Sequence, residues 1–439
     1  MLSNMRTVPY LLILVFVIFS NLEAFIIPEN ERPEFFFSDL NVSLSEFAKK
    51  SPIIRTKAFD LQIAQADEIV AKSEKGFRIG INSYGQSIHE DRPNENFVHR
   101  FRALNQVYLK KPLFHWGALN ALEEIGKLNK KMSQNSITHR TRVLKGELRA
   151  TFLELVVLNY RVKLAEEHVK IAQQNIASAE EKIKFGLETP LYLEEAKAEA
   201  LNREISYADI QIALRRKVSH FMSLSGSADP LNLEIPDIFW DFCSNFIPQT
   251  NFPILVGAIN SNEIENLEIQ SSIETQRIII SNAELKPKVN ITSAYFQDQI
   301  DTAENGQNLD RNNFLVGIEA NWAIWDSHKS SAQKKAALAK RAKYEHLIKT
   351  KSREIRDNLN SMVIELKTLK ERISLARRLV SVAQTRFEKS KLELSLNRIS
   401  PLDHFSAVVA LDAAKINNLE SMCNYMVLLD HYEQLVSSE

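Results

Sequence analysis

The longest regular pattern in the chain is a repeat of apolar residues between Ser327 and Lys391. Apolar side chains recur there at alternating intervals of four and three residues: Ile355, Leu359, Met362, Leu366, Leu369, Ile373, Ala376, Val380, Ala383 and Phe387. No glycine or proline interrupts the segment, and its other positions are mostly charged or polar. This heptad spacing predicts one amphipathic helix about 100 Å long, whose apolar seam must pack against other helices.

Similar spacing recurs elsewhere in the chain. It predicts helices over residues 43–75, 116–184, 190–223, 254–284 and 401–435. The 439 residues include only 11 glycines and 13 prolines, which agrees with long helices and few tight loops. We therefore expect a mainly α-helical protein in which long helices form coiled-coil hairpins.

Between the helices the apolar period changes from that of a helix to two, the period of a strand. Alternation predicts four strands, over residues 77–88, 97–113, 288–296 and 314–325. In the last of these, one face carries Phe314, Val316, Ile318 and Trp322. The length suits a membrane strand with these four side chains facing lipid, and the alternative is a half-buried strand of a soluble sheet.

Four strands are too few for a membrane barrel made by one chain. About eight strands are needed to close a barrel, and an open sheet edge is not tolerated in a bilayer. If the strands lie in a membrane, several chains must contribute to one barrel.

The order of elements is given twice. Pro190 and Pro401 are 211 residues apart, and the strand-to-helix junctions at His115 and Asp326 have the same separation. A constant offset indicates duplication of a whole unit. We assign residues 25–226 to a first repeat and residues 254–439 to a second. Residues 227–253, which include four prolines, are predicted to be a linker with short extended pieces.

The first 24 residues have the pattern of a signal peptide. Arg6 precedes an apolar run, Val8 to Phe19, that is too short to span a bilayer comfortably, and cleavage is expected after Ala24. No cysteine near that site offers a lipid attachment point, and a retained anchor is the alternative. No later segment has about 18 consecutive apolar residues, so we expect no transmembrane helix.

Composition narrows the functional classes. Lys and Arg total 55, as do Asp and Glu, and this neutral balance argues against a nucleic-acid partner. Histidines are scattered, and we find no metal-ligand spacing, phosphate-binding loop or nucleophile motif. We predict that the protein is not an enzyme and has no cofactor or metal. Cys243 and Cys423 are expected to be unpaired thiols, with one disulfide as the alternative.

The turns of the two hairpins have related sequences. Thr189-Pro190 and Ser400-Pro401 each place a residue type that caps helices before a proline at the first helical position. Both hairpins are therefore expected to turn at matched heights.

Taken together, these features resemble the TolC-like outer membrane efflux protein family over nearly the whole mature sequence. The resemblance lies in the duplicated order of helix, strand pair, long helix and short helix, together with local signatures. These signatures are Leu44-Ser45-Glu46-Phe47-Ala48, Ala283 to Val289, Lys111-Pro112-Leu113-Phe114, Trp322 to Asp326, and Pro401-Leu402-Asp403-His404-Phe405-Ser406-Ala407.

The resemblance implies a homotrimer in the outer membrane of a Gram-negative-type cell. Long helical hairpins would form an α-barrel with a long periplasmic portion, continued by a transmembrane β-barrel to which each chain gives four strands. The assembled protein would be the exit duct of a tripartite efflux pump or type I secretion system, a passive conduit from periplasm to exterior. Its partners would be a periplasmic adaptor (membrane fusion) protein, an inner-membrane transporter and outer-membrane lipid. The alternative is a periplasmic coiled-coil scaffold or adaptor without a channel.

The resemblance also implies that the hairpin tips close the duct. Asp403 matches the tip aspartate of the family, and Arg398 is its nearest basic partner in the sequence. The spacing Ser400-x-x-Asp403 is also that of a helix capping box, which gives a structural alternative. Asn397 replaces a glycine that the first repeat keeps as Gly186, and asparagine tolerates the left-handed backbone of such a turn.

Overall fold

The computed structural model describes residues 26–91, 98–227, 229–248, 252, 262–302, 307–396 and 398–436. The predicted signal segment, the start of the helix predicted from residue 254, and Asn397 lie outside these residues. The chain divides into two compact units, each built from both halves of the sequence. The first unit is Met1–Lys57, Ile137–Ser261 and Lys351–Glu439, and the second is Ala58–Ser136 and Asn262–Thr350.

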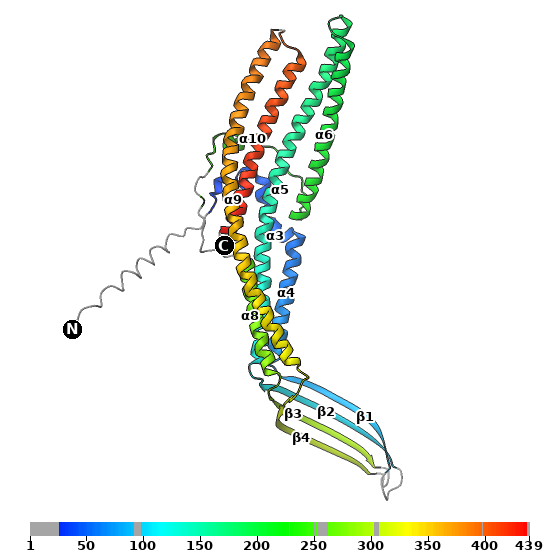
Figure 1. The fold of residues 1–439 in the computed structure, drawn as a ribbon. Helices are drawn as coiled ribbons and strands as arrows, with labels where there is room; N and C mark the ends of the chain where they lie inside the picture. Colours follow the sequence, from blue (N-terminus) through cyan, green and yellow to red (C-terminus); the bar gives the residue numbers. More distant parts are fainter. Residues whose placement is uncertain are drawn as a thin grey trace, which may run out of the picture. The chain divides into compact units, whose positions relative to one another are not determined.

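Two long helices and the shorter helix after each dominate the fold (Figure 1). The long helices α5 (Ala118–Lys184) and α9 (Lys329–Ser395) have 67 residues each. The helices that follow, α6 (Pro190–Ser225) and α10 (Pro401–Val436), have 36 residues each. Corresponding ends are again 211 residues apart, so the predicted helices and their duplication are confirmed.

The heptad seam of α9 is buried where the sequence predicts it. Its most buried members, between 0 and 5% exposed, are Ile355, Leu359, Leu366, Ile373 and Ala376. Between Leu359 and Leu366 the buried residue is Val363 rather than Met362, which is half-buried. In the first unit, part of this seam packs on α10. There Ala383 of α9 forms a small core with Leu411 and Ala414 of α10.

The helix predicted over residues 43–75 is in fact two helices, α3 (Ser38–Lys50) and α4 (Pro52–Ser73). The break lies at Ser51, whose backbone is extended (φ −62°, ψ 124°). Pro52 causes it, because the residue before a proline disfavours the helical conformation. The corresponding helix of the second half, α8, spans Asn262–Ala283.

The predicted linker also needs correction, because it contains helix α7 (Asp237–Asn245). Phe239 and Phe242 of this helix pack against Phe36, with ring centroids 5.1 and 4.7 Å away. Phe36 ends the short helix α2 (Pro33–Phe36), which follows the 3-10 turn η1 (Glu29–Glu31). The linker thus contributes an aromatic cluster to the core of the first unit.

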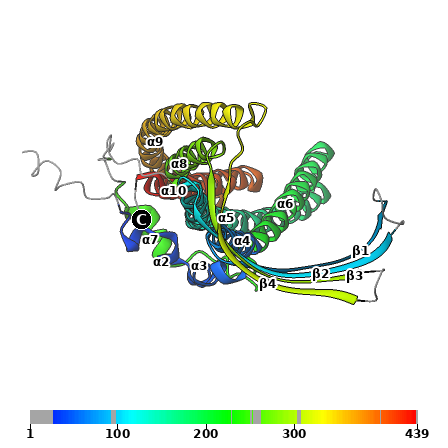
Figure 2. The ribbon, with the colours of Figure 1, turned by 90° about the horizontal axis from the view of Figure 1, so that it is seen from below.

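The four strands form one antiparallel sheet in the order β1-β2-β3-β4 (Figures 1 and 2). They are β1 (Arg78–Glu90), β2 (Val98–Phe114), β3 (Lys288–Thr302) and β4 (Gln307–Asn321). The pairing of β2 with β3 joins the two halves of the sequence. The outer edges of the sheet belong to β1 and β4.

Both strands of the second pair extend farther from the helices than predicted, and β4 ends earlier on the helix side. β3 continues to Thr302, whereas β4 ends at Asn321. Trp322 therefore lies just beyond the strand, which corrects the prediction that it is a strand residue. Its indole nitrogen donates a hydrogen bond to the Leu285 carbonyl (3.0 Å). Farther along, Ser327 has a positive φ (54°) as the chain turns towards α9.

Candidate functional site

The first hairpin tip is closed by a helix-terminating turn at Gly186. Gly186 has a left-handed φ of 69°, which costs a glycine little. Its N–H donates to the Ile183 carbonyl and the Leu187 N–H donates to the Lys182 carbonyl, both at 2.9 Å. This pair of bonds is the Schellman arrangement that satisfies the last carbonyl groups of a helix.

The new helix then begins at Pro190. Thr189 occupies the capping position with an extended backbone (φ −90°, ψ 153°), but its side chain makes no capping hydrogen bond. Thr189 is thus the N-cap residue by position, as predicted, but without the side-chain hydrogen bond that its residue type favours. Pro190 starts the helix as expected, because its fixed φ suits the first helical turn.

The second tip repeats the turn and adds a side-chain cap. The Arg398 N–H donates to the Glu393 carbonyl (2.9 Å), the counterpart of the bond from Leu187 to Lys182. The Ser400 hydroxyl accepts the Asp403 N–H (3.1 Å), while Asp403 Oδ2 accepts the Ser400 hydroxyl (2.7 Å) and N–H (3.2 Å). These reciprocal bonds form a capping box before Pro401 and lower the pKa of Asp403.

The two charged residues predicted to meet at this tip have different partners in the chain. Arg398 forms an ion pair with Glu393, with an Nη1–Oε1 distance of 3.5 Å, and its side chain is 65% exposed. Asp403 is bonded to Ser400. The fold places both residues in the same turn but does not pair them with each other.

Tyr192 is a tip residue that the sequence analysis missed. It lies 211 residues before Asp403, so the two residues are equivalent positions of the repeat. Burial, with the negative charges of Glu188 and Asp403, raises the pKa of Tyr192, and the nearby Ser400 side chain lowers it in part. On its own side, Lys182 Nζ lies 5.9 Å from the Tyr192 ring centroid. Tyr192 of the first tip thus lies near Ser400 and Asp403 of the second, and the repeat offset was the signal that could have found it.

The sheet has one apolar face over its half near the helices. Paired residues place Ile79, Leu109, Ser293 and Val316 in one row, and Ile81, Val107, Tyr295 and Phe314 in the next. Ile291 and Ile318 belong to the same face. Five of these side chains are about 70% exposed: Ile79, Ile81, Phe314, Val316 and Ile318.

The opposite face of the sheet is polar and charged. Arg102 binds Asp298 with two hydrogen bonds of 2.8 Å, and Lys110 lies 2.7 Å from Glu319. The predicted lipid-facing residues Phe314, Val316 and Ile318 therefore share one surface, and charged side chains occupy the other. A sheet with this division fits a boundary between an apolar medium and water.

Comparisons with solved structures agree with this architecture. The Campylobacter jejuni CmeC outer membrane channel matches with a TM-score of 0.75 and 12% identity, over 92% of this chain and 88% of CmeC. The Vibrio cholerae outer membrane protein VceC matches with a TM-score of 0.72 and 14% identity, over 93% and 99%. The open state of the Neisseria gonorrhoeae MtrE outer membrane channel gives 0.71 and 11%, over 94% of each chain.

This chain has the outer-membrane-channel fold. No family model matches its sequence, and neither does any curated protein. The likeness therefore lies in three-dimensional structure, and the resemblance read from element order and spacing led to the same fold.

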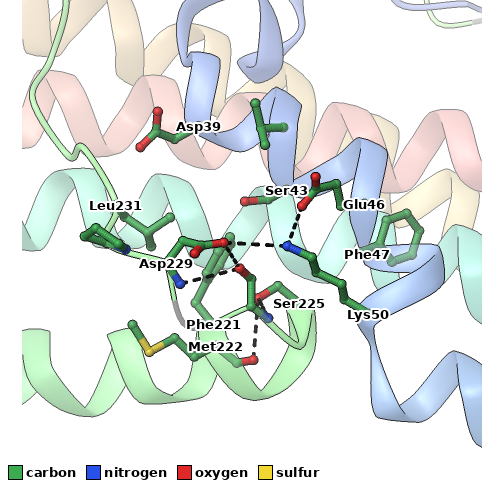
Figure 3. A pocket seen from close by; sticks show the side chains of 13 residues that line it. Asp39, Ser43, Glu46, Phe47, Lys50, Phe221, Met222, Ser225, Asp229 and Leu231 are labelled. Carbon is green, nitrogen blue, oxygen red and sulfur yellow. Dashed lines mark hydrogen bonds and ion pairs between the residues drawn. The ribbon is translucent and has the colours of Figure 1, made fainter.

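Within that fold, the partly open pocket of Figure 3 has a structural role. It has a volume of about 250 Å³ and lies between α3 and the end of α6. Lys50 pairs there with Glu46 (2.6 Å) and Asp229 (3.6 Å), and Gly226 adopts a φ of 73° beside the Lys50 carbonyl. A β-carbon at Gly226 would clash with that carbonyl, so the turn depends on glycine.

Other chemistry is sparse in the described part of the chain. No group of three or more His, Cys, Asp or Glu residues is placed there to hold a metal ion. None of the described helices is both long and apolar enough to cross a bilayer. Cys243 and Cys423 are buried free thiols, and burial raises the pKa of Cys243 to about 12, so this thiol is unreactive.

Proposed function

We propose that the protein is an outer-membrane channel, the exit duct of a tripartite efflux pump or a type I secretion system. It is a passive conduit from the periplasm to the exterior of a Gram-negative-type cell. The observation that carries this proposal is the sheet, whose apolar face is exposed while its opposite face is charged. A bilayer covers such an apolar face, and the charged face lines an aqueous lumen.

The two outer edges of the sheet require more than one chain. In lipid every backbone polar group must be bonded, so β1 of one copy has to pair with β4 of another. Three copies supply twelve strands, which is above the practical minimum for closure. A homotrimer therefore satisfies the edges, and this stoichiometry follows the resemblance stated above.

Apolar stripes on the helices of the first unit support the same assembly. On α6 the exposed stripe is Leu191, Leu201, Ile205 and Ile212, and on α9 it is Ile364, Leu375, Val382 and Leu392. Within each stripe the residues are separated by nearly whole multiples of about 3.5 residues, so they lie along one side of their helix. One chain leaves both stripes open, and neighbouring copies can cover them as helix packs on helix.

The hairpin tips form the periplasmic aperture in this proposal. Copies of Arg398, Asp403 and Tyr192 converge as a ring, and their charges and hydroxyl groups narrow the duct. The partners at this end are a periplasmic adaptor (membrane fusion) protein and an inner-membrane transporter. The protein has no catalytic role in this function, and the repeat boundaries at residues 25–226 and 254–439 are part of the same proposal.

A periplasmic coiled-coil scaffold or adaptor is the competing class. Such a protein needs no sheet with a continuous exposed apolar face, and this sheet argues against it. Membrane fractionation separates the two functions, because a channel is released from outer membranes only by detergent.

Electrical recording in planar bilayers tests the proposed function. The purified mature protein should produce discrete conductance steps, and these should vanish when Val316→Arg disrupts the lipid face. A soluble protein that gives no steps at any concentration would overturn the channel proposal. A variant that removes two charges from α9 in the first unit, Lys367→Gln and Lys370→Gln, is the control and should conduct normally.

A further inference from the structure

Two lysine–aromatic pairs lie at the end of the sheet that adjoins the long helices. Lys286 Nζ lies 4.7 Å from the centroid of Trp116, and Lys111 Nζ lies 4.4 Å from that of Phe77. We call these four residues and Trp322 the collar. Its aromatic rings are largely exposed: Phe77 at 62%, Trp116 at 40% and Trp322 at 61%.

Lys286 is held in place by indoles from both repeats. Trp116 Nε1 donates to the carbonyl of Pro287 (2.8 Å), and Trp322 Nε1 donates to that of Leu285 (3.0 Å). Both indole N–H groups therefore bind the backbone on either side of Lys286. Their ring surfaces stay exposed, and the segment cannot move without breaking these bonds.

Neither collar lysine forms an ion pair with a carboxylate among the residues that the structure describes, because the nearby carboxylates have other partners. Glu284 pairs with Lys288 (3.1 Å), and Glu319 pairs with Lys110 on the opposite face of the sheet. An ammonium over an aromatic ring still has N–H donors directed away from the ring. Lys111 and Lys286 can therefore bind an external anion.

The collar is continuous with the apolar face of the sheet. Lys111 pairs with Ile291, which pairs with Ile318, so the Lys111 side chain belongs to the face that carries the exposed apolar rows. A lysine at the margin of such a face keeps its alkyl stem on apolar surface while its ammonium reaches the polar boundary. Tryptophan rings prefer the same boundary.

We propose that the collar binds the headgroups of anionic phospholipids at the helix-side boundary of the membrane. This inference rests on the proposed membrane function and adds a ligand class to it. The two ammonium groups bind phosphate and a second negative charge, and the rings pack on the glycerol and upper acyl region. The collar thereby sets the depth of the sheet in the bilayer.

Quenching of tryptophan fluorescence by brominated lipid tests the proposal. The mature protein carrying Trp240→Phe, which removes the only tryptophan outside the second unit, is inserted into phosphatidylcholine vesicles with an equal share of phosphatidylglycerol. In two separate samples, either the phosphatidylcholine or the phosphatidylglycerol is brominated, and the quenching in the two samples is compared. We expect phosphatidylglycerol to be preferred at the collar by roughly fivefold for each lysine.

Matched variants assign the preference to the two lysines. Lys111→Gln with Lys286→Gln should abolish the preference, and the corresponding double arginine variant should keep it. Lys367→Gln with Lys370→Gln removes two charges from the first unit and should have no effect. Quenching without headgroup preference, or a preference that survives loss of the two collar lysines, would overturn the inference but leave the channel intact. Absence of quenching by either lipid would instead contradict membrane insertion, and with it both proposals.

Discussion

Adjacent residues of β4 meet opposite environments in the proposed channel. Val316 belongs to the apolar face and is 68% exposed in the single chain, whereas Leu315 belongs to the polar face and is 56% exposed. Exposure alone therefore does not distinguish them. The difference lies in what each side chain faces in the membrane.

The same substitution at these two positions tests that difference. Val316→Arg should reduce the free energy of unfolding of the protein in phospholipid vesicles by about 2 to 4 kcal/mol, because the charge would enter hydrocarbon. Leu315→Arg should change it by less than about 1 kcal/mol, because the new charge would meet the lumen. Urea titration of vesicle-inserted protein measures both. Equal costs at both positions would show that the sheet has no lipid face.

At the second tip, capping and aperture roles of Asp403 can be separated. Asp403→Ala should lower stability by about 1 kcal/mol or less through loss of the capping box, and should raise single-channel conductance. Asp403→Asn keeps an acceptor for the Ser400 groups but removes the charge, so conductance should rise with little loss of stability. Unchanged conductance in both variants would leave capping as the role of Asp403.

The pH dependence of this cap has a definite sign. Hydrogen bonds from Ser400 lower the pKa of Asp403 below its ordinary value of 3.8. The ionised cap therefore stabilises the fold fully above that value, and this contribution is lost as pH falls through the lowered pKa. The stability difference between native protein and Asp403→Ala, followed by thermal unfolding, should be constant near neutral pH and shrink in strong acid.

Among elements, α5 is tied to α2 and α10 by a buried arginine. Arg149 binds Glu34 at 3.0 and 2.5 Å and Asp430 at 2.5 Å, with only 9% of the residue exposed. Arg32 adds an ion pair with Glu433 (2.7 Å). These bonds hold the first described residues of the chain on its last helix. The network compensates buried carboxylates that would otherwise be costly.

Removing this arginine should be far more damaging than removing an exposed one. Arg149→Met leaves Glu34 and Asp430 without their cation and should cost about 3 to 5 kcal/mol. Arg140→Met is the matched control on the same helix, because Arg140 pairs with Glu147 in a half-exposed site. It should cost less than about 1 kcal/mol. Chemical denaturation in detergent measures both, and similar costs would contradict the assigned importance of the buried network.

The elements that sequence reasoning placed well are those governed by long-range periodicity. The seam of α9 and the 211-residue offset predicted the ends of both long helices to within a few residues. Short elements were harder, because helix α7 has nine residues and depends on contacts with Phe36. The break at Pro52 was visible in the sequence, but the apolar pattern continues across it. Tyr192 was missed because its contact with Ser400 exists only after both hairpins fold.

At the scale of the whole molecule, a single chain leaves three kinds of surface uncovered. They are the apolar face of the sheet, the outer edges of β1 and β4, and the apolar stripes on α6 and α9. Lipid covers the first in the proposed channel, and neighbouring copies cover the other two. The central claim is therefore that β1 of one copy pairs with β4 of the next in a ring of three.

Intermolecular disulfide formation between these edges tests the claim most directly. In a background of Cys243→Ser and Cys423→Ser, one cysteine replaces Ile81 on β1 and another replaces Phe314, Val316 or Ile318 on β4, in three separate variants. Cysteines at Leu109 on the inner strand β2 and at Val316 provide the control. After oxidation in membranes, denaturing electrophoresis should show dimers and trimers and nothing larger for at least one edge pair, and monomers for the control. Monomers alone for all three edge pairs, or a ladder that continues beyond three chains, would contradict the trimeric channel.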